Sequence, residues 1–206
     1  MNSQTPLHSP IEFFGKWAET GKDTGMEKGH AESVEFMLEK VISDIKVGFS
    51  FIDAGCGNGW VVRKMNEHPL CHSATGIDGA KQMIKKANSI DPLGNYICDD
   101  LLNWNPLEPV DVVHSMEVLY YLQIPKILIS NIFENWLKPG GKFIFGIDHY
   151  LENPNSLEWP RELRVYMNTL SINNWIELME LAGFIKISTY KIGEKNDWQG
   201  TLVLSG

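Results

Sequence analysis

The sequence predicts a three-layer α/β fold: a mostly parallel sheet of seven strands with helices on both faces and an antiparallel last strand. Two observations predict the parallel part. Between residues 48 and 148, short apolar runs alternate with stretches of helical periodicity, which is typical of parallel strands joined by helical crossovers. The runs are apolar throughout, as expected of strands that are covered on both faces. A third observation predicts the reversed strand, because only residues 193–197 separate the last two apolar runs, and so short a connection makes them antiparallel.

The N-terminal part, residues 1–45, is predicted to be a helical cap on a single domain that spans residues 1–206. Residues 11–19 have the pattern of a short amphipathic helix, and residues 23–30, with two glycines, are predicted to form a loop. A half-buried helix is expected over residues 31–42, because apolar side chains recur there at the spacing of one helix face: Val34, Met37, Leu38, Val41 and Ile42. The first ten residues lack the basic and apolar regions of a signal peptide.

Strands and helices alternate from residue 48 onward. Predicted strands cover residues 48–54, 72–78, 95–99, 110–116 and 142–148, predicted helices cover residues 58–68, 79–89 and 126–137, and a turn is expected at 138–141. Residues 148–170 break this pattern and contain two prolines, so we expect an insert or lid on the substrate side. A last helix begins at residue 172 and ends at Gly183, and two strands follow at 184–192 and 198–206.

Composition narrows the class of partner. The net charge of −8 argues against a nucleic acid or an anionic membrane, since both favour a basic surface. The three cysteines, Cys56, Cys71 and Cys98, fit a reducing, cytoplasmic setting, and no apolar run approaches the roughly 20 residues that cross a bilayer. Two histidines flank Cys71 in "HPLCH", but a fourth ligand at tetrahedral spacing is missing, so no metal site is predicted.

The stretch "FIDAGCGNGW", residues 51–60, points to a ligand site. Its glycines follow the first predicted strand, where an open α/β sheet binds ligands, and glycine lets the main chain approach a ligand closely. Asp53 precedes them, Asp78 ends the second strand and Asp99 ends the third. A carboxylate before the glycines disfavours a pyrophosphate, one at the second strand accepts hydrogen bonds from a ribose diol, and one at the third can accept from an exocyclic amine. Together they describe a positively charged nucleoside without phosphate, such as S-adenosyl-L-methionine.

Five segments carry a family resemblance. "FIDAGCGNG" resembles the first motif of the class I, Rossmann-like S-adenosylmethionine-dependent methyltransferases, and "TGIDGA", "YICDDLLNW", "VDVVHSMEVLYYL" and "LKPGGKFIF" are similar to the segments that follow in that family, in the same order. The resemblance covers roughly residues 30–206. It implies a Rossmann-like fold and S-adenosyl-L-methionine as the cofactor.

The resemblance also implies a role for each matching residue. Gly55, Cys56 and Gly57 would pass under the methionyl part and the ribose, and Asp53 would organise the loop and favour the ammonium group. Asp78 would hold the ribose hydroxyls beside Gly79, and Asp99 the adenine amine, with the amide of Asp100 or Leu101 on the ring nitrogen. Near the sulfonium and over the cofactor we expect Ser115, Met116, Tyr121 (or Tyr120) and Trp17.

Some of these residues have structural alternatives. Asp53 could accept a hydrogen bond within its own turn, Asp78 could cap the next helix, and one of Asp99 and Asp100 could be a surface turn residue. Cys56 is expected to fill space, since nothing nearby indicates an activated thiolate.

The acceptor side is less determined by sequence. Methyl transfer from a sulfonium needs alignment above all, and a general base only if the nucleophile arrives protonated. The catalytic candidates are His149, Tyr150, Glu117 and His30. We expect a cytoplasmic methyltransferase acting on a small or medium-sized metabolite. Three alternatives remain: a protein or peptide methyltransferase, a non-catalytic S-adenosylmethionine binder and, less favoured by the acid before the glycines, an NAD-dependent oxidoreductase.

Overall fold

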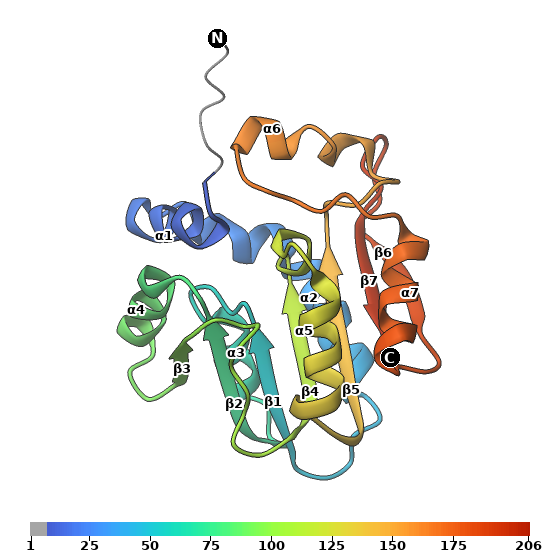
Figure 1. Ribbon diagram of the computed structural model, residues 1–206. Coiled ribbons are helices and arrows are strands. Elements are labelled where there is room, and N and C mark those ends of the chain that lie inside the picture. The colour runs from blue at the N-terminus through green and yellow to red at the C-terminus, as the bar shows by residue number, and fades with distance from the viewer. Residues whose placement is uncertain (1–7) are drawn as a thin grey trace.

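The computed structural model describes residues 8–206. The first seven residues, part of the segment that lacks signal-peptide features, lie outside the described residues. A single seven-stranded sheet carries helices on both faces, which confirms the predicted fold class (Figure 1). No helix among residues 8–206 is long and apolar enough to span a membrane.

The sheet has the strand order β3-β2-β1-β4-β5-β7-β6. Its strands are β1 (Phe49–Ala54), β2 (Cys71–Asp78), β3 (Asn95–Cys98), β4 (Val110–Met116), β5 (Leu137–Ile147), β6 (Ser188–Ile192) and β7 (Thr201–Ser205). The first five are parallel, and β7 lies between β5 and β6 and is antiparallel to both. Strand order reverses between β1 and β4, so a crevice for ligands is expected at their carboxyl ends.

Each face of the sheet has its own core. On one face pack α2 (Thr24–Ile42), α3 (Trp60–Asn66) and α4 (Lys81–Ile90), and on the other α5 (Pro125–Asn131) and α7 (Ile172–Ala182) (Figure 1). Successive strand residues point to opposite faces, so that Phe51 belongs to the first core and Ile52 to the second. This is why the central strand β1 is buried along its whole length.

Three local predictions differ from the structure. Residues 23–30, predicted to be a loop, belong largely to α2, which begins at Thr24. Gly25 and Gly29 are exposed there, and the buried stripe farther along α2 stabilises the helix in spite of their low helix propensity. The turn predicted at 138–141 lies within β5 as an irregularity, because the pairing with β4 passes from Val110–Leu137 to Val112–Lys142, and Gly140 has a φ of 78° there. The predicted helix at 126–137 ends early as α5 and continues as a π-helical turn, Ile132–Trp136.

Two segments lie over the carboxyl ends of the parallel strands. One is α1 (Pro10–Thr20), which packs on α4, and the other is residues 148–170 with the short helix α6 (Trp159–Leu163) (Figure 1). They meet where the His8 amide donates a hydrogen bond to the Arg164 carbonyl, at 2.8 Å. The backbone amide of Asn168 donates a hydrogen bond to the Tyr120 carbonyl at 2.7 Å, which joins the second segment to the residues that follow β4.

Candidate active site

The glycine-rich loop, residues 55–59, joins β1 to α3 at the carboxyl edge of the sheet. Gly55, Gly57 and Gly59 have positive φ angles of 82°, 52° and 79°. Gly55 has to lack a side chain, because a Cβ there would lie 2.1 Å from Val118. At Gly57 the nearest atom to an added Cβ is a sulfur at 4.0 Å, so the backbone there is open to a ligand.

Asp78 ends β2 and holds the loop in place. Its carboxylate accepts hydrogen bonds from the Gly57 amide at 2.9 Å and from the Ala80 amide at 2.7 Å. Burial raises the pKa of this carboxyl above its ordinary value, the two amide bonds oppose that shift, and the charge of Asp53 adds to it. The N-cap of α4 is Ala80, so Asp78 is not the helix cap; it accepts a bond in the turn before α4 and lines the larger cavity.

Asp53, in the middle of the first motif, pairs with His114 of β4. The two residues are directly opposite in the parallel register of β1 and β4, and His114 Nδ1 lies 2.7 Å from Asp53 Oδ1. Both side chains are buried, and His114 Nε2 has no hydrogen-bond partner. Sequence reasoning missed His114, although a histidine within the apolar run "VDVVHSM" was a usable signal.

Two adjoining cavities lie at this edge of the sheet. The larger has a volume of about 460 Å³, and eight of the residues that the resemblance assigns to the cofactor line it: Gly55, Gly57, Asp78, Gly79, Asp100, Leu101, Met116 and Tyr121. The smaller, of about 40 Å³, is lined by Asp53, Cys56 and His30, among others. Glu117 lines both cavities, which places one catalytic candidate between them.

Part of the larger cavity was not predicted. One wall comes from Ile11 and Phe14 of α1, and another from Ile124 and Ile127 at the start of α5. The amphipathic pattern of residues 11–19 was the one available signal for the first wall. Ile11 and Ile124 are 51% and 58% exposed because they border a cavity that is open at the surface.

Five predicted residues lie outside the linings of both cavities. Asp99 is exposed, and its carboxylate accepts from the Asp100 amide at 2.8 Å. Ser115 is buried and donates to the Ala54 carbonyl at 2.8 Å, which ties β4 to β1. Trp17 packs against Phe13 and Phe14 within α1.

The two candidates that follow β5 belong to the core instead. His149 is fully buried, with Nδ1 2.9 Å from the Ser156 carbonyl and Nε2 2.9 Å from the Thr169 hydroxyl. Tyr150 is fully buried too, and its hydroxyl donates to the carbonyls of Gln199 and Gly200 at 3.0 Å. The bonds of Tyr150 fasten residues 148–170 to the residues that precede β7, and those of His149 join two parts of this segment to each other.

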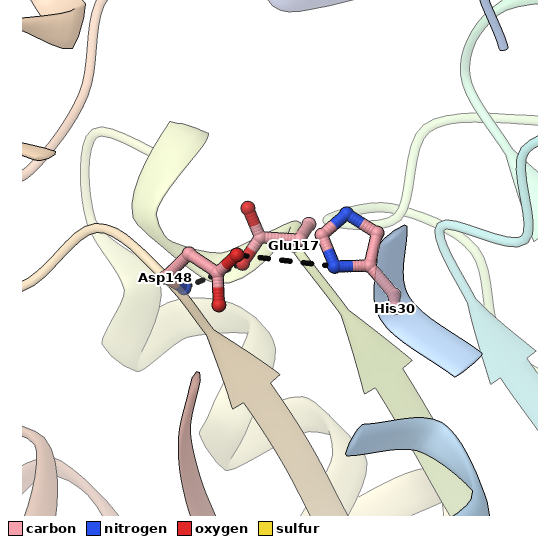
Figure 2. Close-up of side chains that lie close together, drawn as sticks. All are labelled: His30, Glu117 and Asp148. Atoms are coloured by element: carbon pink, nitrogen blue, oxygen red, sulfur yellow. Dashed lines mark hydrogen bonds and ion pairs between the residues drawn. The ribbon is translucent and has the colours of Figure 1, made fainter. Parts of the chain in front are cut away.

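His30, Glu117 and Asp148 point toward one another from α2 and from the ends of β4 and β5 (Figure 2). Donor atoms from all three lie within 4.8 Å of one another, and His30 Nδ1 is 3.8 Å from Asp148 Oδ2. Glu117, at a φ of 59°, accepts from the Asp148 amide at 2.5 Å and from the Tyr120 hydroxyl at 2.6 Å. Such a group could hold a metal ion or an organic cation.

Burial sets the protonation of this group, which we call the His30–Glu117–Asp148 cluster. It raises the pKa of Glu117 well above its ordinary value, and the charge of Asp148 adds to the shift. It also raises the pKa of Asp148, against the bond from Thr201 and the charge of His30. Burial lowers the pKa of His30, although Asp148 opposes this. In the free protein, burial thus favours the neutral form of each of the three groups.

The polar atoms of the cavities suit the expected cofactor. Asn58 and His114 line the smaller cavity, and Asn58 Oδ1 and His114 Nε2 are buried without a partner. With His114 Nδ1 directed at Asp53, Nε2 of a neutral ring is an acceptor, so both atoms can accept hydrogen bonds from an ammonium group. In the described chain, no lysine or arginine lines either cavity, which disfavours a diphosphate and favours a cationic nucleoside.

Comparisons with known proteins agree with this geometry. Residues 6–189 match a family described as a methyltransferase domain. Malonyl-[acyl-carrier protein] O-methyltransferase 2 of Ilyobacter polytropus is 28% identical over 155 residues, 70% of this chain and 57% of that protein. Trans-aconitate 2-methyltransferase of Azoarcus sp. is 25% identical over 104 residues, 50% of this chain and 41% of that protein. The chain thus aligns with only about half the length of these relatives.

Solved structures share the fold. A chain in a complex between the Haloferax volcanii Trm112 methyltransferase activator and a methyltransferase has a TM-score of 0.78 and 25% identity, over 94% of this chain and 96% of that one. N-methyltransferase NodS of Bradyrhizobium japonicum, in complex with S-adenosyl-L-homocysteine, has a TM-score of 0.66 and 19% identity over 85% of each chain, and so shows the fold alone. Since the family match covers most of its length, the chain belongs to the class I S-adenosylmethionine-dependent methyltransferase family, whose cofactor is S-adenosyl-L-methionine.

Proposed function

We propose that this protein transfers the methyl group of S-adenosyl-L-methionine to a small or medium-sized metabolite. The observation that carries the proposal is the larger cavity, which combines the glycine-rich loop and Asp78 with apolar walls. Its volume of about 460 Å³ is that of a small-molecule site. A methyl donor supplies the activated carbon, so the protein has to align the acceptor and exclude water. The proposed location is the cytoplasm.

We assign the nucleoside part of the cofactor to the larger cavity. Asp78 holds the ribose hydroxyls, the amide of Asp100 or Leu101 meets the adenine ring, and Met116 lies near the sulfonium. Asp99 stays a prediction for the adenine amine, since its exposed side chain has to turn toward the cavity to reach it.

The smaller cavity is assigned to the methionyl ammonium. Asn58 Oδ1 and His114 Nε2 would accept from it, and the charge of Asp53 behind His114 would favour it. The ammonium would thereby satisfy two buried atoms that have no partner in the protein itself.

Relatives support the size of the acceptor more than its identity. Their names give malonyl-[acyl-carrier protein], trans-aconitate and, for a protein of Zea mays, phosphoethanolamine as methyl acceptors. The Haloferax chain is bound to an activator protein. The test of methyl transfer described below is therefore also run with a protein extract of the source organism added, as a source of an activator.

The experiment is calorimetry followed by methyl transfer. We expect S-adenosyl-L-methionine and S-adenosyl-L-homocysteine to bind with 1:1 stoichiometry and NAD not to bind. Labelled cofactor is then incubated with a metabolite extract and, separately, with a protein fraction, and we expect label in the metabolites. Binding of NAD alone would remove the methyltransferase proposal, and label confined to proteins would replace the small acceptor by a protein. Cofactor binding without transfer to either fraction would favour the non-catalytic binder.

A further inference from the structure

The walls of the active site carry charge of one sign. Besides the Tyr121 phenol, the ionisable side chains that line the larger cavity are the carboxyls of Asp78, Asp100 and Glu117. The smaller cavity adds Asp53, Cys56, His30 and His114, together with Asp23, whose carboxylate is paired with Lys86 at 2.6 Å. No lysine or arginine among the described residues lines either one. A carboxylate or phosphate on the acceptor would enter a region without a cationic partner, whereas a cationic acceptor would be attracted.

The cofactor assignments give no role to Glu117, to Asp148, which lies outside the linings of both cavities, or to Asp23, whose carboxylate accepts a bond from Lys86. Glu117 lines the larger cavity together with Met116, the residue assigned to the sulfonium, so its carboxyl lies on the side from which an acceptor can approach. Asp148 brings a second carboxyl against it, and His30 brings a basic nitrogen (Figure 2).

The protein holds these carboxyls in place. Tyr120 and the Asp148 amide each donate to one oxygen of Glu117. Thr201 donates to Asp148 Oδ1 at 2.6 Å, and Ser33 donates to Thr201 at 2.9 Å. Two acids kept together in this way are a costly arrangement in a free protein, because burial raises the pKa of both and the charge of Asp148 raises that of Glu117 further. A cation between them would relieve that cost.

We infer that the methyl acceptor is an amine, whose ammonium group binds between Glu117, Asp148 and His30 and whose nitrogen is methylated. The inference rests on the proposed function, since it names the acceptor of the same site. It excludes the carboxylate acceptors that the names of two relatives give, and it disfavours a phosphorylated amine.

His30 gives the ammonium a route to lose its proton. The bound ammonium transfers one proton to the neutral imidazole, which frees the lone pair of the nitrogen. A bond then forms between this nitrogen and the methyl carbon while the carbon–sulfur bond breaks, and the electron pair of that bond stays on sulfur as the neutral thioether. The product leaves as a methylated ammonium, and His30 returns its proton to solvent.

The test compares acceptors that share one carbon frame. Protein saturated with S-adenosyl-L-homocysteine is titrated calorimetrically with phenethylamine, 2-phenylethanol and 3-phenylpropanoic acid, and with putrescine as a slim diamine. We expect the amines to bind at least about tenfold more tightly than the alcohol, and the acid to bind least. With labelled cofactor and a metabolite extract, we expect labelled product that cation exchange retains at neutral pH.

Variants assign the effect to the cluster. Glu117→Gln and Asp148→Asn remove charge with little change in shape, and Glu134→Gln makes the same change on an exposed residue. Both cluster variants should lose about tenfold or more in amine affinity. Asp148→Asn, at a residue that lines neither cavity, should keep the affinity for S-adenosyl-L-homocysteine within about twofold, and Glu134→Gln should change neither affinity. His30→Gln should keep amine binding and lower the rate of transfer, with recovery as pH rises.

Several results would overturn the inference. They are tighter binding of the acid, a labelled methyl ester that mild base releases as methanol, no amine binding by the loaded protein, or equal amine affinity in all the variants. Amine binding that needs added Mn²⁺ and disappears with EDTA would make the cluster a metal site instead. Failure of S-adenosyl-L-homocysteine itself to bind would count against the proposed function, whatever the amines do.

Discussion

Replacing Asp78 by alanine should both weaken cofactor binding and lower the free energy of unfolding, and the two effects can be measured separately. The carboxylate accepts two amide bonds within the protein, from Gly57 and Ala80, so its removal leaves two donors without partners. Each costs about 1–3 kcal/mol, a loss of about 2–6 kcal/mol in the free energy of unfolding. A domain of ordinary stability, about 5–15 kcal/mol, tolerates most of that range.

The loss in cofactor affinity comes from the ribose. Hydrogen bonds to a charged acceptor contribute about 1–3 kcal/mol, so the dissociation constant of S-adenosyl-L-homocysteine should rise about 5- to 150-fold. Asp78→Asn keeps one acceptor oxygen and should fall between the two proteins, whereas Asp44→Ala, on an exposed residue, should change nothing. Calorimetry is carried out where circular dichroism shows native protein. A folded Asp78→Ala variant that binds as tightly as the parent would refute the ribose role.

Three other perturbations test the structure more locally. Gly55→Ala should lower the free energy of unfolding by about 1–3 kcal/mol, because the added Cβ contacts Val118. Gly25→Ala, on an open helix surface, should raise it by about 0.5–1 kcal/mol. Both changes are measured by urea unfolding, and equal effects would contradict the loop geometry. His114→Leu should cost about 3–5 kcal/mol in the same assay, because it leaves the buried Asp53 carboxylate without its partner, and a change near zero would show that the pair is unimportant. Glu117, which faces Asp148, His30, Tyr120 and Tyr121, has a raised pKa, so between its ordinary and raised values the native state binds more protons than the unfolded one. Its contribution to stability is therefore present at low pH and is lost as pH rises through the raised pKa. The parent should gain stability relative to Glu117→Gln as pH is lowered toward the ordinary range of a carboxyl, whereas parallel curves would contradict the shift.

The glycine-rich loop and the acids near it could be located from the sequence because they lie at the ends of neighbouring strands and are recognised by local spacing. An acid before a glycine loop and an acid at the next strand end can be found from spacing alone, and Asp78 and Gly57 are indeed joined by a hydrogen bond. The loop predicted at 23–30 failed for a related reason, since two glycines were weighed without the buried stripe that follows them in α2.

What the sequence could not predict depends on contacts between distant segments. Asp53 and His114 are 61 residues apart, and only the register of β1 with β4 brings them together. His30, Glu117 and Asp148 come from three elements, so no spacing in the chain marks them as one cluster. His149 shows the converse, because its place after a strand end indicated the cavity, while the hydrogen bonds of both its ring nitrogens turn it toward the core.

Helix α1 has a consequence for the pace of turnover. It forms one wall of the larger cavity, yet Gly15 is the single residue that it buries fully. Its other apolar contacts, through Phe13 and Phe14, are made by half-buried side chains, and segments anchored in that way detach at lower free energy than the sheet unfolds. We expect exchange of spent for fresh cofactor to pass through such a detached state, so that departure of the helix, rather than the chemical step, limits the steady-state rate.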